Sequence, residues 1–300
     1  MGEFNEPLSR NEAILQNILG ASNELEEPKS RIEEILQSIL YDTEYTDEPQ
    51  SRIEELLLAI KNSGEYDKQP LSRNEKILIA KLNGLEYKET TYSRIEELLK
   101  EWTLKIPSIY QEVEYIESTG SQYIDTGVLN KGALKSKITF VYTDLSSQQK
   151  GNLFGIYDTT TGDRSYINLT SGNKWQFGYG NGNYYFVSNN SPIINTKYEL
   201  EGIWASTQQK LTINGNVMYS GSETITKSDA VSAYLFGTNG TNFHGCLKLY
   251  SCIIFDGENI IRNFIPCYRK SDGEIGLYDI VNGVFYTNEG TGTFVKGQNV

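Results

Sequence analysis

Histidine and cysteine are scarce in this chain of 300 residues, which contains one histidine and three cysteines. A zinc site with four cysteine or histidine ligands has almost no material here, and neither CxxC nor HExxH occurs. Three cysteines cannot all pair with one another, so no disulfide framework is indicated. A hydrolase triad would have to use His244, but no serine lies in a GxSxG motif.

Basic residues are also in deficit, with 27 lysines and arginines against 39 aspartates and glutamates and a net charge of −12. Nucleic-acid binding needs a basic surface that displaces counterions from phosphates, and an acidic membrane surface would repel this chain. No apolar run has the length of a membrane-spanning helix, and the first residues lack the pattern of a signal peptide. We therefore expect no nucleic-acid partner, no membrane contact and no secretion.

The composition changes sharply near Pro107. Residues 1–106 hold 22 acidic and 13 basic residues but only 4 glycines and 7 aromatic residues. Residues 107–300 hold 17 acidic and 14 basic residues, 23 glycines and 28 aromatic residues. The first composition is typical of helices and the second of sheets and turns. The chain is therefore expected to be an α + β multidomain protein.

The first part is an internal repeat with a constant period of 21 residues. Serine followed by arginine recurs five times, and proline stands two residues before four of these serines. A serine N-cap with glutamate three residues later is a capping box: the hydroxyl accepts the N3 amide, and the carboxylate reaches back to the N-cap amide. The sequence predicts five helix-turn repeats over residues 9–106. The capping pairs are Ser9 with Glu12, Ser30 with Glu33, Ser51 with Glu54, Ser72 with Glu75, and Ser93 with Glu96.

Apolar residues follow these caps at helical spacing and form one narrow stripe on each helix of about three turns. A lone helix of this length is marginal in water, so the stripe must be buried. We call the members of this pattern in the second, third and fifth repeats the stripe residues. They are Ile32, Ile35, Leu36, Ile39, Ile53, Leu56, Leu57, Ile60, Ile95, Leu98, Leu99 and Trp102.

Three arrangements could bury these stripes. The prolines would interrupt a continuous coiled coil at about 3 kcal/mol each. Two-layer solenoids need helix pairs and about 33 residues or more per unit. Burial against copies of the same chain is the simplest remaining arrangement. We therefore expect a parallel shaft of identical chains in which the stripe residues form the core. A homotrimer is favoured over a homodimer, partly by the stripe and partly by a resemblance named below.

Asn11 and Asn74 occupy the position that isoleucine fills in the other repeats. One interpretation is a surface position at the end of a layer. The other is a buried polar ring that fixes the register, as single core asparagines do in coiled coils.

The second part predicts an antiparallel β-sandwich. Short alternating runs recur between turn signals every 8 to 12 residues, and Asn282-Gly283 is a strong hairpin signal. Ten or more short strands in residues 107–300 favour a two-sheet jelly roll.

Paired carboxylates for glycoside hydrolysis are poorly supported in this part. Sandwich glucanases carry Glu-x-Asp-x-Glu along one strand, and no such string occurs. Glu112 with Glu114, and Glu199 with Glu201, share a face, but the second pair lies opposite an apolar set that indicates a solvated strand face. We assign no catalytic residue and expect no enzymatic activity.

Sugar binding requires an aromatic plate and a few amides or carboxylates, and the region from Asp163 to Asn190 supplies both. Alternation places Trp175, Phe177 and Tyr179 on one face, a pattern found in cores more often than in binding sites. The candidate carbohydrate-binding residues are Trp175, Tyr179, Asn181, Asn183, Tyr184 and Tyr185.

Metal binding has a weaker basis. Acidic side chains in predicted loops could hold calcium, but solvated turns carry the same residues. We expect no cofactor, with calcium as the alternative. The acids concerned are Asp158, Asp163, Asp256 and Glu258.

Two long motifs open and close the second part: VEYIESTGSQYIDTGV at 113–128 and IPCYRKSDGEIGLYDIVNGVFYTNEGTGTFVKG at 265–297. They resemble the concanavalin A/laminin G-like lectin module found in structural proteins of phages and prophages. The repeat pattern EPxSRIEELL is similar to segments of phage fibre proteins. A trimeric helix-turn array also resembles the head fibres of small tailed phages.

These resemblances imply a virion fibre, made in the host bacterial cytoplasm and not secreted. They imply a virion anchor at 1–8, a shaft at 9–106 and a concanavalin A-like head at 107–300. The expected partners are two further copies of the chain, a capsid or tail protein at the N-terminus, and host-surface or environmental glycan at the head. The alternatives are a glycan depolymerase on the same scaffold and a bacterial surface adhesin.

Overall fold

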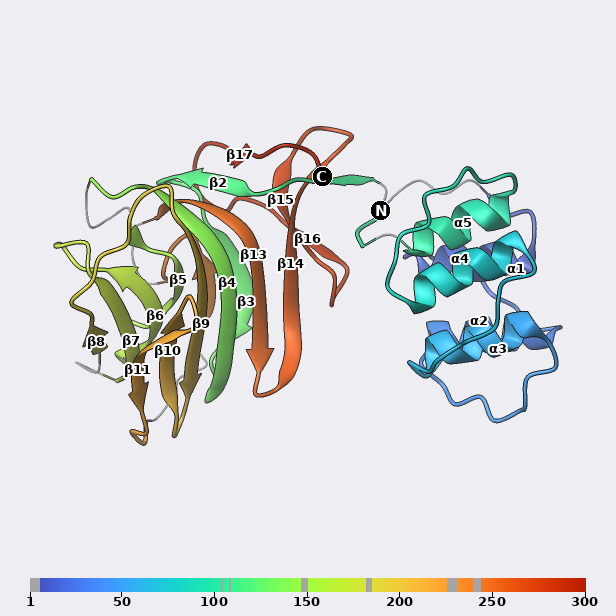
Figure 1. Cartoon of the computed structure of the whole chain (residues 1–300), viewed down its shortest axis with the longest axis horizontal. Coiled ribbons are helices and arrows are strands. Elements are labelled where there is room, and N and C mark those ends of the chain that lie inside the picture. Colours follow the sequence, from blue (N-terminus) through green and yellow to red (C-terminus); the bar gives the residue numbers. More distant parts are fainter. Residues whose placement is uncertain are drawn as a thin grey trace. The chain divides into compact units, whose positions relative to one another are not determined.

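The structure is a computed structural model that describes residues 6–103, 105–107, 109–146, 151–181, 185–225, 231–239 and 244–300, without the side chain of Asn181. The chain forms two compact units, Met1–Ile109 and Tyr110–Val300. We call them the helical unit and the sandwich unit (Figure 1).

The helical unit contains one short helix per repeat, as the sequence predicts. In the described residues no helix is long and apolar enough to cross a membrane. The helices are α1 (Arg10–Ile18), α2 (Arg31–Leu40), α3 (Arg52–Lys61), α4 (Arg73–Leu82) and α5 (Arg94–Thr103).

In each repeat, one hydrogen bond of the capping glutamate differs from that of the expected capping box. The amide of Glu12 donates to the hydroxyl of Ser9 at 3.2 Å, and the other four repeats have the same bond. The carboxylate of Glu12, however, accepts the amide of Leu8 at 2.9 Å and not that of Ser9. The backbone of Ser9 is extended, so the amide before it turns toward the first helical turn. All five glutamates bond the amide of the residue before their serine.

The arginine after each serine joins one repeat to the next. Arg10 Nε donates to Glu33 at 2.9 Å, and the next three arginines reach the glutamate 23 residues ahead in the same way. Arg94 has no sixth repeat ahead of it, and its Nε lies 3.0 Å from Glu12 in the first repeat. Nη2 of the same guanidinium donates to the carbonyl of Glu6 at 2.8 Å. The same contacts that join consecutive repeats therefore join the last repeat to the first.

The five helices thus form a closed ring within one chain, in which α5 packs against α1. The helix-turn array is confirmed. Its assembly as a shaft of three chains stays a prediction, although the ring supplies within one chain the burial for which the trimer was invoked. The expectation of a trimer assumed that the array was open. Closure gives every helix a neighbour on both sides, so all twelve stripe residues pack in a single core inside the ring. Ile35 and Leu56, for example, have no exposed surface.

Asn11 and Asn74 lie on the inner wall of this ring. They line an axial cavity of about 160 Å3, and Asn11 Oδ1 is buried without a hydrogen-bond partner. Both side chains are partly exposed, so they are neither surface positions outside a layer nor a fully buried polar ring. The other lining residues are Ile32, Ile53, Ile95, Leu15, Leu36, Leu57, Leu78 and Leu99.

Acid is expected to loosen the ring, because its junctions depend on ionised glutamates. The amide of Lys29 and then the guanidinium of Arg10 lower the pKa of Glu33, and bonded amides and arginines lower the pKa of its counterparts in the third to fifth repeats. A lowered folded-state pKa gives stability that is complete above the unfolded value of 4.5 and is lost as the pH falls through the folded value. The helical circular dichroism signal should therefore decline from about pH 5 downward. A helical signal that is unchanged at about pH 2 would contradict this.

The sandwich unit consists of two antiparallel sheets, which confirms the predicted fold. The smaller sheet has the order β3 (Ile124–Leu129), β12 (Ser232–Leu235), β5 (Phe154–Tyr157), β6 (Asp163–Leu169), β7 (Trp175–Asn181) and β8 (Tyr185–Val187). The main path of the larger sheet is β11 (Asn216–Gly221), β10 (Gln209–Ile213), β9 (Lys197–Ala205), β4 (Ala133–Asp144), β13 (Cys246–Asp256), β14 (Asn259–Arg269), β15 (Ile275–Asp279) and β16 (Val284–Tyr286). Beside this path, β1 (Tyr110–Glu112) pairs with β14, β2 (Ile116–Thr119) pairs with β13, and β17 (Val295–Lys296) pairs with β2.

Large aromatic side chains fill the space between the two sheets. Phe154, Phe177 and Trp204 have no exposed surface, and the indole of Trp204 donates to the carbonyl of Gly178 at 2.9 Å. The hydroxyl of Tyr142 donates to the carbonyl of Gly151 at 2.9 Å, and burial raises the pKa of this phenol. These two bonds satisfy polar groups that would otherwise be buried at a cost.

The two long sequence motifs hold the edge of the larger sheet together. Gln122, in the first motif, is buried; it accepts the amide of Thr119 at 2.8 Å and donates to the carbonyl of Thr291 at 3.1 Å. Asp279, in the second, has no exposed surface and accepts the amide of Asn263 and the side-chain amide of Asn282. At these positions the two motifs therefore form hydrogen bonds that stabilise the fold.

Candidate functional site

The structure places two of the carbohydrate-binding candidates in the core, and their assignment as contact residues is corrected here. Trp175 is 3% exposed and Tyr179 is 7% exposed. Both belong to the alternating stripe of β7 that faces the larger sheet, and the hydroxyl of Tyr219 donates to that of Tyr179 at 2.5 Å. Neither ring offers a free face to a sugar.

The other candidates follow Tyr179 along the chain. Asn183 and Tyr184 lie outside the described residues, and only the backbone of Asn181 is described, at the end of β7. Tyr185 is 46% exposed on β8 and projects from the opposite side of the sheet from the core. It is the one candidate that the described residues place on an accessible surface.

Tyr185 belongs to a row of tyrosines and glycines that crosses the outer face of the smaller sheet. The strand register pairs it with Gly178, Gly178 with Tyr166, Tyr166 with Gly155, and Gly155 with Tyr234. Tyrosine and glycine therefore alternate from β8 to β12. We use the name tyrosine face for the outward side chains of β5 to β8, which include Tyr157, Arg164, Tyr166, Asn168, Gln176 and Tyr185.

The glycines allow the ring of Tyr166 to lie flat on the sheet. A Cβ atom on Gly178 would lie 2.4 Å from this ring, and one on Gly155 would lie 2.4 Å from the Cα atom of Tyr166. Any other residue at either position would displace the ring or the strand. Tyr166 is 7% exposed and forms the floor of the tyrosine face.

Tyr157 and Arg164 lie next to Tyr166 on the tyrosine face, on the side toward β5. The rings of Tyr157 and Tyr166 meet edge to face with centroids 6.2 Å apart. The guanidinium of Arg164 lies 5.0 Å from the centroid of Tyr157 and donates to its hydroxyl at 3.4 Å. The planar cation is thereby held against an aromatic ring, an attractive arrangement.

Polar groups lie beside the aromatic rings. Asn168 on β6 stands directly opposite Gln176 on β7, on the same outer face as Tyr166. Asn168 Oδ1 is buried and has no hydrogen-bond partner. A buried carbonyl oxygen without a partner costs free energy, and the partly exposed side chain of Asn168 would remove this cost by turning the oxygen toward a ligand.

A second aromatic group continues the face at β12. The ring of Tyr123 stacks on Tyr234 at 4.6 Å and on His244 at 4.8 Å between centroids. Burial lowers the pKa of His244, so the imidazole is neutral near pH 7. The one histidine of the chain thus packs against tyrosine.

The calcium candidates do not come together. Among the described residues no group of three or more acidic, histidine or cysteine side chains is arranged to hold a metal ion. Asp158 is buried and accepts the amide of Thr160 at 2.8 Å within its own turn. Glu258, in the turn after β13, is 93% exposed in its side chain.

The carboxylates of β9 lie on a solvated face of the larger sheet. Glu201 is 4.0 Å from Lys135 and 3.9 Å from Lys137, and Glu199 is exposed. These ion pairs on an exposed strand face are consistent with the structural interpretation of this pair.

No family model matches the chain, and no curated protein matches it. Among solved structures, one similar fold is a Bacteroides ovatus ATCC 8483 protein whose assignment as a carbohydrate binding protein is provisional. It has 11% identity and a TM-score of 0.45, covering 63% of this chain and 62% of that one. The SAP-like pentraxin of Limulus polyphemus has 10% identity and a TM-score of 0.35, covering 49% of this chain and 76% of that one.

A third similar structure is the sialidase of Trypanosoma rangeli, with 15% identity and a TM-score of 0.34. The match covers 41% of this chain and 20% of the sialidase, so the chain spans about a fifth of the length of that enzyme. The expectation that the chain has no enzymatic activity is corrected by this match, because enzymes are among the proteins with a similar fold. At these identities the comparisons concern the sandwich fold alone.

The sequence of β7 contains a signal for the tyrosine face, but the aromatic residues on the other side of the strand are more conspicuous. In Trp-Gln-Phe-Gly-Tyr-Gly, at 175–180, the large aromatic residues alternate with glutamine and two glycines. The aromatic side packs in the core, and the glycine side leaves room for rings from neighbouring strands. The strand register then places Tyr166 and Arg164 opposite these glycines.

Proposed function

We propose that the sandwich unit binds glycan on the tyrosine face. The observation that carries the proposal is the partnerless carbonyl of Asn168 beside the ring floor of Tyr166. Pyranose rings present an apolar face that packs on aromatic rings and hydroxyls that donate hydrogen bonds. Tyr185, which is 46% exposed, supplies the aromatic surface beside the buried ring of Tyr166, and Asn168 and Gln176 supply amide groups.

The charge of the site favours a neutral or acidic glycan. Arg164 is the charged side chain among the six residues that define the tyrosine face, and its guanidinium lies against Tyr157. The site is an open sheet surface, so a sugar of a larger polymer could reach it without entering an enclosed pocket.

Substitution of Tyr185 tests the proposal. After a glycan array has identified a bound glycan, Tyr185→Ala should raise its Kd about two- to twelvefold, because one aromatic contact contributes about 0.5–1.5 kcal/mol. Isothermal titration calorimetry provides the measurement. Tyr41→Ala is the matched control, since Tyr41 is also exposed but belongs to the helical unit. The site assignment fails if the array is blank, or if the two variants bind equally well.

The same incubations should be assayed for released reducing sugar. Release that depends on the protein would establish catalysis on the bound glycan. Stable binding without release would support a lectin-like role.

We also propose that the chain is a virion appendage that presents the sandwich unit to host-surface or environmental glycan. The support is the resemblance of both long motifs and of the repeats to phage structural proteins. Residues 1–8 would hold the contact with a capsid or tail protein. Mass spectrometry of purified virions should detect the chain in stoichiometric amounts, and its absence from them would refute this role.

A further inference from the structure

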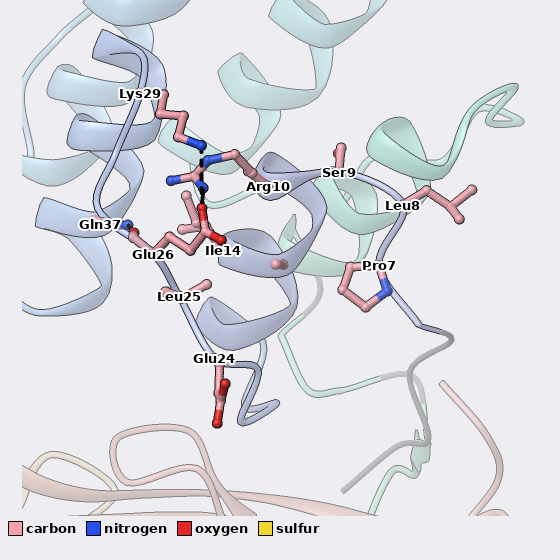
Figure 2. A pocket seen from close by; sticks show the side chains of 11 residues that line it. Pro7, Leu8, Ser9, Arg10, Ile14, Glu24, Leu25, Glu26, Lys29 and Gln37 are labelled. Atoms are coloured by element: carbon pink, nitrogen blue, oxygen red, sulfur yellow. Dashed lines mark hydrogen bonds and ion pairs between the residues drawn. The ribbon is translucent and has the colours of Figure 1, made fainter.

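The first repeat contains an open cleft of about 390 Å3 that lies between α1 and the segment leading to α2. Figure 2 shows Arg10, Glu26 and Lys29 gathered on one side of this cleft, with Pro7 and Leu8 on the other. Ala13 and Ile14 of α1 and Glu24 and Leu25 of the segment also line it. We call it the first-repeat cleft.

The other repeats show what fills this space. At 21-residue spacing from Glu24 stand Tyr45, Tyr66 and Tyr87. All three tyrosines pack against the core of the ring, and Tyr87 is 6% exposed. The second, third and fourth repeats therefore place a phenol ring where the first repeat has an exposed glutamate.

The surroundings of those rings have counterparts in the cleft. The guanidinium of Arg31 lies 5.9 Å from the ring centroid of Tyr45, and Arg52 lies 5.8 Å from that of Tyr66. The corresponding arginine of the first repeat is Arg10, which lines the cleft. A ring that entered the cleft would meet the same cation, an attractive contact.

Two further differences keep the cleft open. Ala13 stands where the second and third repeats have glutamate, so the helix side of the cleft carries a shorter side chain. The segment beside it is fixed to α1 by Asn17, whose side chain accepts the amide of Asn23 at 2.7 Å and donates to its carbonyl at 2.9 Å. Leu25 reaches the core but is smaller than a tyrosine.

We propose that the first-repeat cleft binds a tyrosine side chain of a partner protein. The chain's own repeats serve as the template for this contact. The cleft opens to solvent beside Leu8, which is 77% exposed, so the backbone of a partner segment can remain outside and cover this leucine. Aromatic anchors that enter a pocket in this way carry much of the energy of protein interfaces.

The flanking charges favour an acidic residue next to that tyrosine. In the second to fourth repeats a glutamate directly precedes the tyrosine, whereas the first repeat has Asn23 at that position. Lys29 lies at the cleft, where the other repeats have glutamine, leucine or tyrosine at the same position. A partner segment of the form Glu-Tyr would place its carboxylate near this lysine.

The test uses the full chain and an acetylated, amidated peptide with the sequence of residues 44–49, EYTDEP. We expect weak binding with a Kd on the order of 1 mM. Amide chemical shifts of Arg10, Ala13 and Lys29 should move as the peptide is added. The same peptide with alanine in place of tyrosine should bind at least tenfold more weakly.

Two variants separate the cleft from other surfaces. Glu24→Tyr supplies the missing ring and should weaken peptide binding at least tenfold, with the thermal unfolding temperature unchanged or raised. Tyr45→Ala opens a second cleft and should increase the number of bound peptides from one to two.

The proposal is overturned if the peptide does not shift these resonances, or if Glu24→Tyr binds it as well as the original chain does. Binding of p-cresol without binding of the peptide would also overturn it, because the cleft would then be a small-molecule site. If Glu24→Tyr fails to fold, the peptide stoichiometry of Tyr45→Ala decides: one bound peptide refutes the inference and two support it.

Discussion

Deletion of residues 51–71, one complete repeat, is expected to abolish most of the helical structure of the chain. In a closed ring each helix is buried by both neighbours, and five repeats bring Arg94 to Glu12 and Glu6. Four repeats would leave a gap that these side chains cannot span. An open rod would instead lose one layer and keep the others, since stability in open arrays is roughly a sum over neighbours. Circular dichroism at 222 nm should therefore fall by far more than the one fifth that a rod would lose.

Replacement of residues 51–71 by a second copy of residues 30–50 is the matched control. It keeps five repeats, the arginine, the capping pair and the stripe, so the helical signal should be retained. Resistance to trypsin gives an independent measurement on both proteins. A four-repeat chain that stays helical and resistant would show that the ring is not required.

Substitution of Gly178 by leucine is expected to eliminate glycan binding by the tyrosine face while the sandwich remains folded. Already the first added atom, a Cβ, would lie 2.4 Å from the ring of Tyr166, so the ring must leave the floor of the site. The side chain would project outward from β7, away from the core residues Phe177 and Tyr179. Loss of the floor and obstruction of the face should together raise the Kd at least about tenfold, or about 1.4 kcal/mol.

Gly172→Ala in the turn between β6 and β7 is the control for this substitution. A Cβ atom there would meet only the hydroxyl of Thr170 at 3.9 Å, so binding should be unchanged. The near-ultraviolet spectrum of both variants reports whether the aromatic core is intact. Glycan affinity that survives Gly178→Leu in a folded protein would place the binding site elsewhere.

The sequence predicted the local structure of the helical unit well, because capping is a short-range property. Serine and glutamate three residues apart mark the start of each helix within one residue. Closure was not predicted, because it depends on the angle between successive repeats, which no single repeat encodes. The arginine after each serine was the available signal. A long cation at a fixed place in every copy, with a glutamate at a fixed place in the next, indicates a bond between repeats.

In the sandwich unit, alternation predicted strands but did not show which side of β7 faces the core. The side chains of Trp175 and Tyr179 suit a sugar-binding surface and a hydrophobic core equally well. The register of β6 and β7 distinguishes the two sides of β7, because it places Tyr166 opposite Gly178. Register depends on pairing between segments, so the composition of one strand could not provide it.

The closed ring also sets the order in which the chain can fold during synthesis. Junctions between consecutive repeats join residues 23 positions apart, whereas the contact between Arg94 and Glu6 spans 88 positions. Local contacts form quickly, and distant ones wait for the chain that supplies them. The first repeat must therefore leave the ribosome with one flank uncovered and keep it so until the fifth repeat has been made. Each nascent chain passes through an open form whose two ends are complementary, and encounters between such chains could exchange repeats before either ring closes.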